Sequence, residues 1–116
     1  MKKLFNKSQA NSQIAIELAI AESFISRLQG LMFTRSLPMG SALWIRKCKS
    51  IHTFFMNFAI DVIFIDKNLV VKRVYRNLAP WHMTKIIWQA DSVIELSAGT
   101  LSSVRVDIGD ELYVGD

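Results

Sequence analysis

The chain has 116 residues, of which 51% are hydrophobic, so it is long enough for one domain with a packed core and too short for two ordinary ones. Its formal net charge is +4, and its single cysteine excludes an intramolecular disulfide. No apolar run follows Lys2 and Lys3 as in a signal peptide, and none approaches the roughly 20 residues of a membrane span. We therefore expect a soluble, cytoplasmic protein.

The N-terminal segment is predicted to change character near residue 11. Residues 1–10 carry three lysines and no acid, which indicates a flexible basic lead-in to a single globular domain at 11–116. Ile14, Ile16, Leu18 and Ile20 then alternate with Ala and Glu, which predicts one strand over 14–20 with an apolar face.

A short early helix is expected next. Ser23 can serve as its N-cap, Phe24, Leu28 and Leu31 recur at helical spacing, and Gly30 can end it in a left-handed cap. Residues 34–41 contain Pro38 and Gly40 and are typical of a loop.

The centre of the chain predicts strands. The first covers 42–48, and the run 62–65 between two aspartates predicts a strand that is buried on both faces. Lys67-Asn68 is a turn, after which 69–75 returns as the second arm of a hairpin.

The last third predicts shorter elements. The chain bends around Pro80, the segment 84–90 is ambiguous, and 93–96 is a strand. Gly99-Thr100 begins a short helical turn, and residues 112–114 form the final strand. The predicted fold class is α+β and β-rich: a curled or barrel-like, mostly antiparallel sheet with one early helix and one short late helix.

Charge is distributed unevenly along the chain. Residues 23–90 carry ten basic and two acidic side chains, whereas residues 91–116 carry six acidic side chains and Arg105. The basic middle could form a patch for an acidic partner or phosphate, or its charges could lie on separate solvated faces. No nucleic-acid-binding motif accompanies it, so we do not expect a nucleic-acid partner.

Several short motifs together resemble the family named "domain of unknown function 192". They occur in order as R-L-Q-G-L-M-F-T-R (27–35), I-H-T-F-F-M (51–56), D-V-I-F-I-D (61–66), P-W (80–81), E-L-S-A-G (95–99) and G-D (109–110). The resemblance covers about residues 11–115. It differs at Ser97, where the family has proline, at Phe55, where many members have tryptophan, and around 39–43. It implies a small β-rich α+β fold and no established activity.

Cys48, His52 and Met56 follow one another at intervals of four residues, and all three are ligands for soft metals such as copper. They could equally be two core side chains and a locally hydrogen-bonded histidine. Cys48 and His52 could also act as nucleophile and base, with neighbouring cations favouring the thiolate. No third orienting residue accompanies them, so a cysteine-dependent hydrolase is only a third hypothesis.

Three carboxylates are of interest. Asp61 and Asp66 flank the buried strand, where such residues usually accept turn hydrogen bonds, although paired carboxylates can also catalyse hydrolysis. Glu95 interrupts an apolar strand. It either points outward or points inward against a cation, for which Arg35 or His52 are candidates.

The leading functional hypothesis is a non-enzymatic binding or accessory module without a cofactor. The sequence contains no phosphate loop, dinucleotide motif, complete catalytic triad or strong metal cluster. We expect a shallow cleft for a peptide, protein or small polar ligand. Its candidate residues are His52, Thr53, Trp81, Glu95 and Arg35. A copper-like site at Cys48, His52 and Met56 is the alternative.

Overall fold

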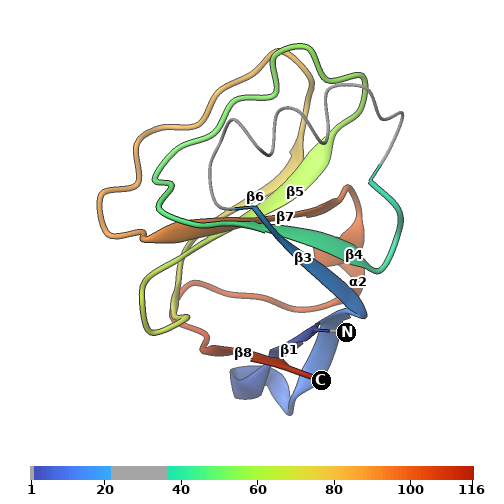
Figure 1. Cartoon of the computed structure of the whole chain (residues 1–116), viewed down its shortest axis with the longest axis vertical. Coiled ribbons are helices and arrows are strands. Elements are labelled where there is room, and N and C mark those ends of the chain that lie inside the picture. Colours follow the sequence, from blue (N-terminus) through green and yellow to red (C-terminus); the bar gives the residue numbers. More distant parts are fainter. Residues whose placement is uncertain (1, 22–36) are drawn as a thin grey trace.

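The computed structural model describes residues 2–21 and 37–116, which form two β-sheets (Figure 1). The larger sheet has the strand order β3-β4-β7-β5-β6, and the smaller has the order β2-β1-β8. The strands are β1 (Lys3–Asn6), β2 (Ser12–Ala15), β3 (Glu17–Ala21), β4 (Ser41–Ile45), β5 (Ile60–Ile65), β6 (Val71–Leu78), β7 (Ser92–Ser97) and β8 (Leu112–Gly115). The short helices are the 3-10 helix η1 (Lys7–Gln9) and α2 (Thr100–Ser103).

The prediction of a β-rich, mostly antiparallel fold is confirmed. Among the described strands, β3 and β4 are parallel and the other pairs are antiparallel. The described strands do not close into a barrel, because β3 and β6 are the outer strands of the larger sheet. The late helix is confirmed as α2, while the early helix predicted after Ser23 lies outside the described residues. No helix in the described part of the chain could cross a membrane.

The two central strands of the larger sheet, β5 and β7, are buried along their whole length. Ile63 and Ile94 pack into the core cluster that also contains Leu4 of the smaller sheet, whereas Phe64 and Val93 pack into a second cluster. That second cluster includes residues of the loops 46–59 and 79–91. These loops therefore cover one face of the sheet, which explains why β5 is apolar on both faces.

The predicted strand over 14–20 is divided between the two sheets. The backbone N–H groups of Ile16 and Glu17 both donate to the Gly40 carbonyl oxygen, at 2.8 and 3.1 Å. The chain bends there, so Ile14 is buried in β2 and Leu18 in β3, while Ile16 is exposed. The expected continuous apolar face is therefore wrong, because it assumed one straight strand.

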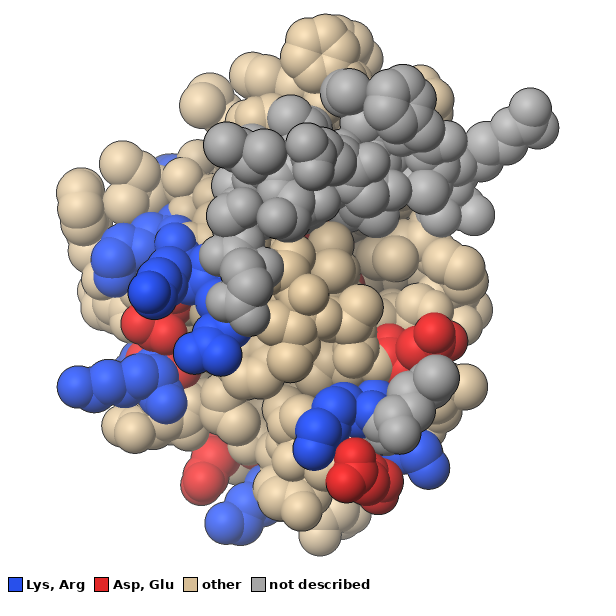
Figure 2. All heavy atoms as spheres, viewed as in Figure 1, with Lys and Arg blue, Asp and Glu red and all other residues tan. Residues whose placement is uncertain are grey.

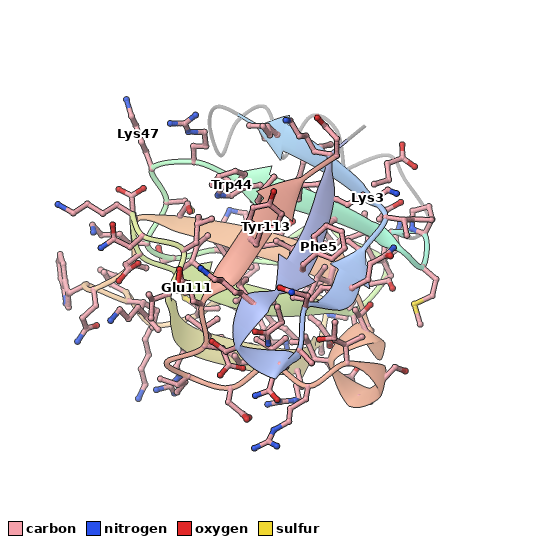
Figure 3. The ribbon with its side chains drawn as sticks, turned by 90° about the horizontal axis from the view of Figure 1, so that it is seen from below. Lys3, Phe5, Trp44, Lys47, Glu111 and Tyr113 are labelled. Carbon is pink, nitrogen blue, oxygen red and sulfur yellow. The ribbon has the colours of Figure 1, made fainter. Side chains whose placement is uncertain are left out.

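Residues 3–6 also depart from the expected flexible lead-in. They form β1, the middle strand of the smaller sheet, in which Leu4 is fully buried. Asn6 is buried as well, and its side-chain amide donates to the Arg105 carbonyl oxygen at 3.0 Å and to Asp110 Oδ2 at 2.9 Å. Figure 3 shows Phe5 and Tyr113 side by side on β1 and β8, with ring centroids 6.0 Å apart.

Candidate functional site

The loops 46–59 and 79–91 are paired with each other through their backbones. His52 and Met83 form an isolated antiparallel bridge. Three backbone hydrogen bonds extend this pairing: Thr53 N–H to the His82 carbonyl (2.8 Å), Thr84 N–H to the Ile51 carbonyl (2.9 Å) and Ile87 N–H to the Lys49 carbonyl (2.8 Å). The two loops therefore form one connected unit, although about thirty residues separate them in the sequence.

Thr53 lies at the centre of this unit and is fully buried. Its hydroxyl donates to the Ala79 carbonyl at 2.6 Å and accepts the His82 N–H at 2.9 Å. Its own carbonyl oxygen accepts the N–H of Trp81 at 3.0 Å and that of Met56 at 3.2 Å. One threonine thus fixes both loops, because buried polar groups retain their hydrogen bonds.

Four rings from the two loops form a continuous row of contacts, which we call the aromatic ladder. Its members are His52, Phe54, Phe55 and Trp81. The ring centroids of His52 and Phe54 are 4.7 Å apart, and those of Phe54 and Trp81 are 6.0 Å apart, both in stacked arrangements. Phe55 meets Trp81 at 4.9 Å with the rings tilted by 60°. These distances lie in the range of favourable aromatic pairs.

The outer end of the ladder is exposed and has an unusual backbone. Phe55 is 58% exposed and Trp81 is 60% exposed. Their φ angles are +68° and +64°. For bulky residues the left-handed conformation costs about 1–2 kcal/mol, and such conformations concentrate at functional sites. The fold therefore holds two large apolar rings in water at a conformational cost.

A hollow of about 380 Å³ lies beside the ladder, and His52 belongs to both. The described residues that line it are Lys47, Cys48, Lys49, Ser50, Ile51, His52, Met83 and Thr84, and none of these is a carboxylate. The backbone N–H of Phe54 lies 3.2 Å from His52 Nδ1, so this nitrogen is the acceptor. The neutral imidazole then carries its proton on Nε2. Figure 3 shows Lys47 extending outward from the edge of the molecule.

The structure brings together only part of the predicted cleft. His52 and Trp81 lie in the ladder, and Thr53 lies beneath it, where it positions the loops without reaching the surface. Glu95 is fully buried in β7, opposite Leu43 of β4 and Val62 of β5. The outward orientation of Glu95 is therefore wrong, since strands on both sides and packing on both faces enclose it. Arg35 lies outside the described residues.

Of the three residues of the metal hypothesis, Cys48 and Met56 belong to the same buried core cluster, whereas His52 is only partly buried. Cys48 and His52 line the same hollow, and the Cys48 thiol donates to the Ser50 carbonyl oxygen at 2.9 Å. Met56 is 1% exposed and packs in the core cluster beneath the loops. Within residues 2–21 and 37–116, no three or more His, Cys, Asp or Glu side chains form a group that could hold a metal ion. Copper binding stays a prediction.

Asp61, within β5, and Asp66, directly after it, make structural hydrogen bonds. Asp61 is buried and accepts the N–H groups of Asn77 at 2.7 Å and Leu101 at 2.8 Å. Asp66 accepts those of Asn68 and Val70 in the hairpin turn. Burial alone would raise the pKa of Asp66, but these two N–H groups and the nearby Lys72 hold that pKa below its ordinary value. Asp66 therefore fits the expected turn role. The same expectation is wrong for Asp61, which lies within β5 and joins it to residues distant in the sequence.

Sequence reasoning did not select Phe54 and Phe55 as site residues. The available signal was the Phe-Phe pair directly after His52 and Thr53, in a stretch from 50 to 60 without any charged residue other than histidine. An apolar pair of this kind is more often part of a core. The loop pairing and the positive φ of Phe55, which are visible in the structure and not in the sequence, distinguish this pair from an ordinary core pair.

Comparison with known proteins gives a consistent result. A family model described as "Uncharacterized ACR", domain of unknown function 192, matches residues 6–114. A UPF0127 protein of Pyrococcus horikoshii is 39% identical over 99 residues, covering 83% of this chain and 85% of the relative. A UPF0127 protein of Pyrococcus furiosus is 35% identical over 103 residues, covering 86% and 88%.

Two crystal structures share the fold. One is a proposed transcription regulator from Sinorhizobium meliloti, with a TM-score of 0.83 and 19% identity over 98% of this chain and 94% of that chain. The other is a protein of unknown function from Novosphingobium aromaticivorans, with a TM-score of 0.77 and 15% identity over 97% and 82%. At these identities the likeness shows the fold alone.

Proposed function

Since this chain belongs to the uncharacterised family named domain of unknown function 192, we propose its function from its own geometry: it is a non-catalytic module that binds a short peptide segment of a partner protein. The peptide lies across the aromatic ladder and places a polar or anionic group in the adjacent hollow. The proposal rests above all on the contact between Phe55 and Trp81, whose exposed rings are both held in the left-handed backbone conformation.

The ladder supplies the apolar part of this recognition. Trp81 and Phe55 offer broad rings whose positions are fixed before binding, because Thr53 anchors the backbone of Trp81. Tryptophan is enriched among the residues that dominate binding energies, and a preorganised ring loses little entropy when a partner packs against it. An apolar or aromatic side chain of the peptide would cover these two rings.

The hollow supplies the polar part. Lys47, Lys49 and His52 give its lining a positive or hydrogen-bond-donating character, and no carboxylate stands among the described residues of this lining. Lys49 is partly engaged, since its ammonium group donates to the carbonyl oxygens of Trp88 and Ala90. A carboxylate of the peptide, either an acidic side chain or its C-terminus, matches these donors by charge.

The test is a selection from a displayed random-peptide library on the immobilised protein, followed by affinity measurement by fluorescence polarisation. Removing a central anchor ring typically costs 2 kcal/mol or more, so Trp81→Ala should weaken the selected peptides about 30-fold. Trp88→Ala is the matched control, because Trp88 is also an exposed tryptophan of the 79–91 loop but has no part in the ladder. Failure to enrich any peptide, or equal effects of the two variants, would contradict the proposal.

A further inference from the structure

A second unusual surface lies at the far end of the 79–91 loop, and we call it the basic apolar patch. Its apolar members are Ile86, Trp88 and Ile108, which are 51%, 72% and 64% exposed. Its basic members are Lys67, Lys72, Arg73 and Lys85. Residues 79–90 contain no acidic side chain. The patch shares no residue with the aromatic ladder.

The apolar side chains of the patch are held outward by a buried neighbour. Ile87, between Ile86 and Trp88, is buried in the core cluster, and its N–H donates to the Lys49 carbonyl at 2.8 Å. The Lys49 ammonium group donates to the Trp88 carbonyl at 3.2 Å and to the Ala90 carbonyl. The fold therefore fixes this loop in a form that exposes an isoleucine and a tryptophan.

Basic side chains share a hollow with Ile86 and Ile108, and Trp88 lies between Ile87 and Gln89, two residues that also line this hollow. This hollow of about 470 Å³ is lined, in the part of the chain that the structure describes, by residues that include three cations and no carboxylate: Lys72, Arg73, Lys85, Ile86, Ile87, Gln89 and Ile108. A neighbouring hollow shares Lys72 and Gln89 and adds Lys67, with Asp66 and Asp91. Asp66 pairs with Lys72 at 3.5 Å, so part of the charge is neutralised. Figure 2 shows a group of Lys and Arg side chains with acidic ones among them on the left of the molecule, and further Lys and Arg side chains toward the lower right.

We propose that the basic apolar patch docks the protein on the surface of an anionic phospholipid bilayer. The lysines and arginine attract the anionic headgroups of the bilayer surface. Trp88 suits the interface itself, where tryptophan is enriched, and Ile86 and Ile108 suit the acyl boundary just below it. Basic and apolar side chains in this combination are typical of peripheral membrane contacts.

The apolar members favour a bilayer over a nucleic acid. A single-stranded nucleic acid would use the cations and could stack a base on Trp88. It offers no apolar phase for Ile86 and Ile108, which together with Trp88 make up the exposed apolar area of the patch. A bilayer satisfies both the charges and the two isoleucines, so it is the occupant that matches the whole patch.

The experiment is co-sedimentation of the full chain with vesicles of pure phosphatidylcholine and with vesicles containing phosphatidylglycerol. We expect binding only to the anionic vesicles, and its loss at high salt, because about 1 M salt shortens the screening length to about 3 Å. Lys85→Glu should lower the partition coefficient about tenfold or more, since it changes the surface charge by two. Trp88→Ala should lower it by a similar factor.

Two matched variants separate this proposal from peptide binding. Trp81→Ala should keep vesicle binding, and Lys7→Glu, an exposed lysine of η1, should lower it less than Lys85→Glu. The proposal is overturned if neither vesicle is bound or if neutral and anionic vesicles bind equally. It is also overturned if Trp81→Ala acts as strongly as Trp88→Ala, or if a labelled oligonucleotide is bound through Trp88 while anionic vesicles are not.

Discussion

Thr53 and Trp81 are joined by a hydrogen bond in which the Trp81 N–H donates to the Thr53 carbonyl oxygen at 3.0 Å. One partner is fully buried and the other carries an indole that is 60% exposed. The exposed ring is therefore attached to a residue of the protein interior, and its position depends on the integrity of the loop pairing.

Replacing Thr53 by valine tests this dependence. Valine keeps the shape but removes the hydroxyl that bonds the Ala79 carbonyl and the His82 N–H. Because two polar groups lose their partner, we expect the free energy of unfolding in urea to fall by about 1–3 kcal/mol. Ser103→Ala, at an exposed position in α2, is the control and should change it by less than about 0.5 kcal/mol. Equal effects would contradict the anchoring role.

Glu95 gives a second stability prediction. A carboxylate this deeply buried persists in a fold only when it is paired or hydrogen-bonded, so its removal disrupts those interactions and opens a cavity. Glu95→Ala should lower the free energy of unfolding by about 3–5 kcal/mol. Glu17→Ala, on the exposed side of β3, should leave it within about 0.5 kcal/mol. A small effect of Glu95→Ala would show that the buried carboxylate is not a structural anchor.

Asp110 accepts hydrogen bonds from Asn6 and Gln9 and so joins the N-terminal and C-terminal segments. The free energy of unfolding should therefore depend on the ionisation of Asp110. Burial alone would raise the pKa of Asp110, but hydrogen bonds from Asn6, Asp107 and Gln9, with the charge of Arg105, hold it below its ordinary value. A carboxyl whose pKa is lowered by folding stabilises the fold above its unfolded pKa of about 3.9, and this contribution is lost as pH falls through the folded pKa.

The variant Asp110→Asn should therefore be less stable than the wild type near neutral pH, and the difference should shrink below pH of about 3. Urea denaturation at several pH values measures this difference. Asp116→Asn is the control, because Asp116 is exposed and its ion pair with Lys2, at 3.4 Å, joins two exposed side chains. A difference that stays constant down to the lowest pH would contradict the predicted linkage.

Copper binding can be decided by anaerobic titration with Cu(I) against a competing chelator. The Cys48 thiol already donates to the Ser50 carbonyl, and Met56 is buried in the core, so we expect no binding stronger than that of the chelator. Cys48→Ser and His52→Ala are the comparison variants. Tight one-to-one binding that both substitutions abolish would establish the metal site instead.

The elements that were predicted well are those whose sequence pattern is local. The run at 62–65, the Lys67-Asn68 turn and the returning strand specify β5 and β6 without reference to the rest of the chain. Glycine at 99, with φ of +95°, likewise precedes α2 where the sequence placed a helical turn. Such features depend on burial pattern and backbone freedom, which neighbouring residues reveal.

The features that were missed depend on contacts between distant residues. β1 is stabilised because Leu4 packs in the core and Asn6 donates a hydrogen bond to Asp110. The flanking lysines and polar residues give this segment no sequence pattern typical of a strand. The aromatic ladder requires the pairing of Thr53 with His82 across the two loops. No periodicity within either loop encodes that pairing. His52 and Trp81 could therefore be selected from the sequence as candidates, but their common contact with Phe54 could not be predicted.

The most direct test of the peptide-binding proposal is a two-dimensional ¹⁵N–¹H NMR titration of the labelled protein with a peptide selected from the library. We predict that the shifted amide signals come from residues 47–55 and 81–84, which form the ladder and the hollow, and that Trp81→Ala abolishes the shifts. The proposal would be contradicted if the shifts instead centred on the separate hollow lined by Phe5, Lys7, Asn11 and Tyr113, or if they persisted in Trp81→Ala.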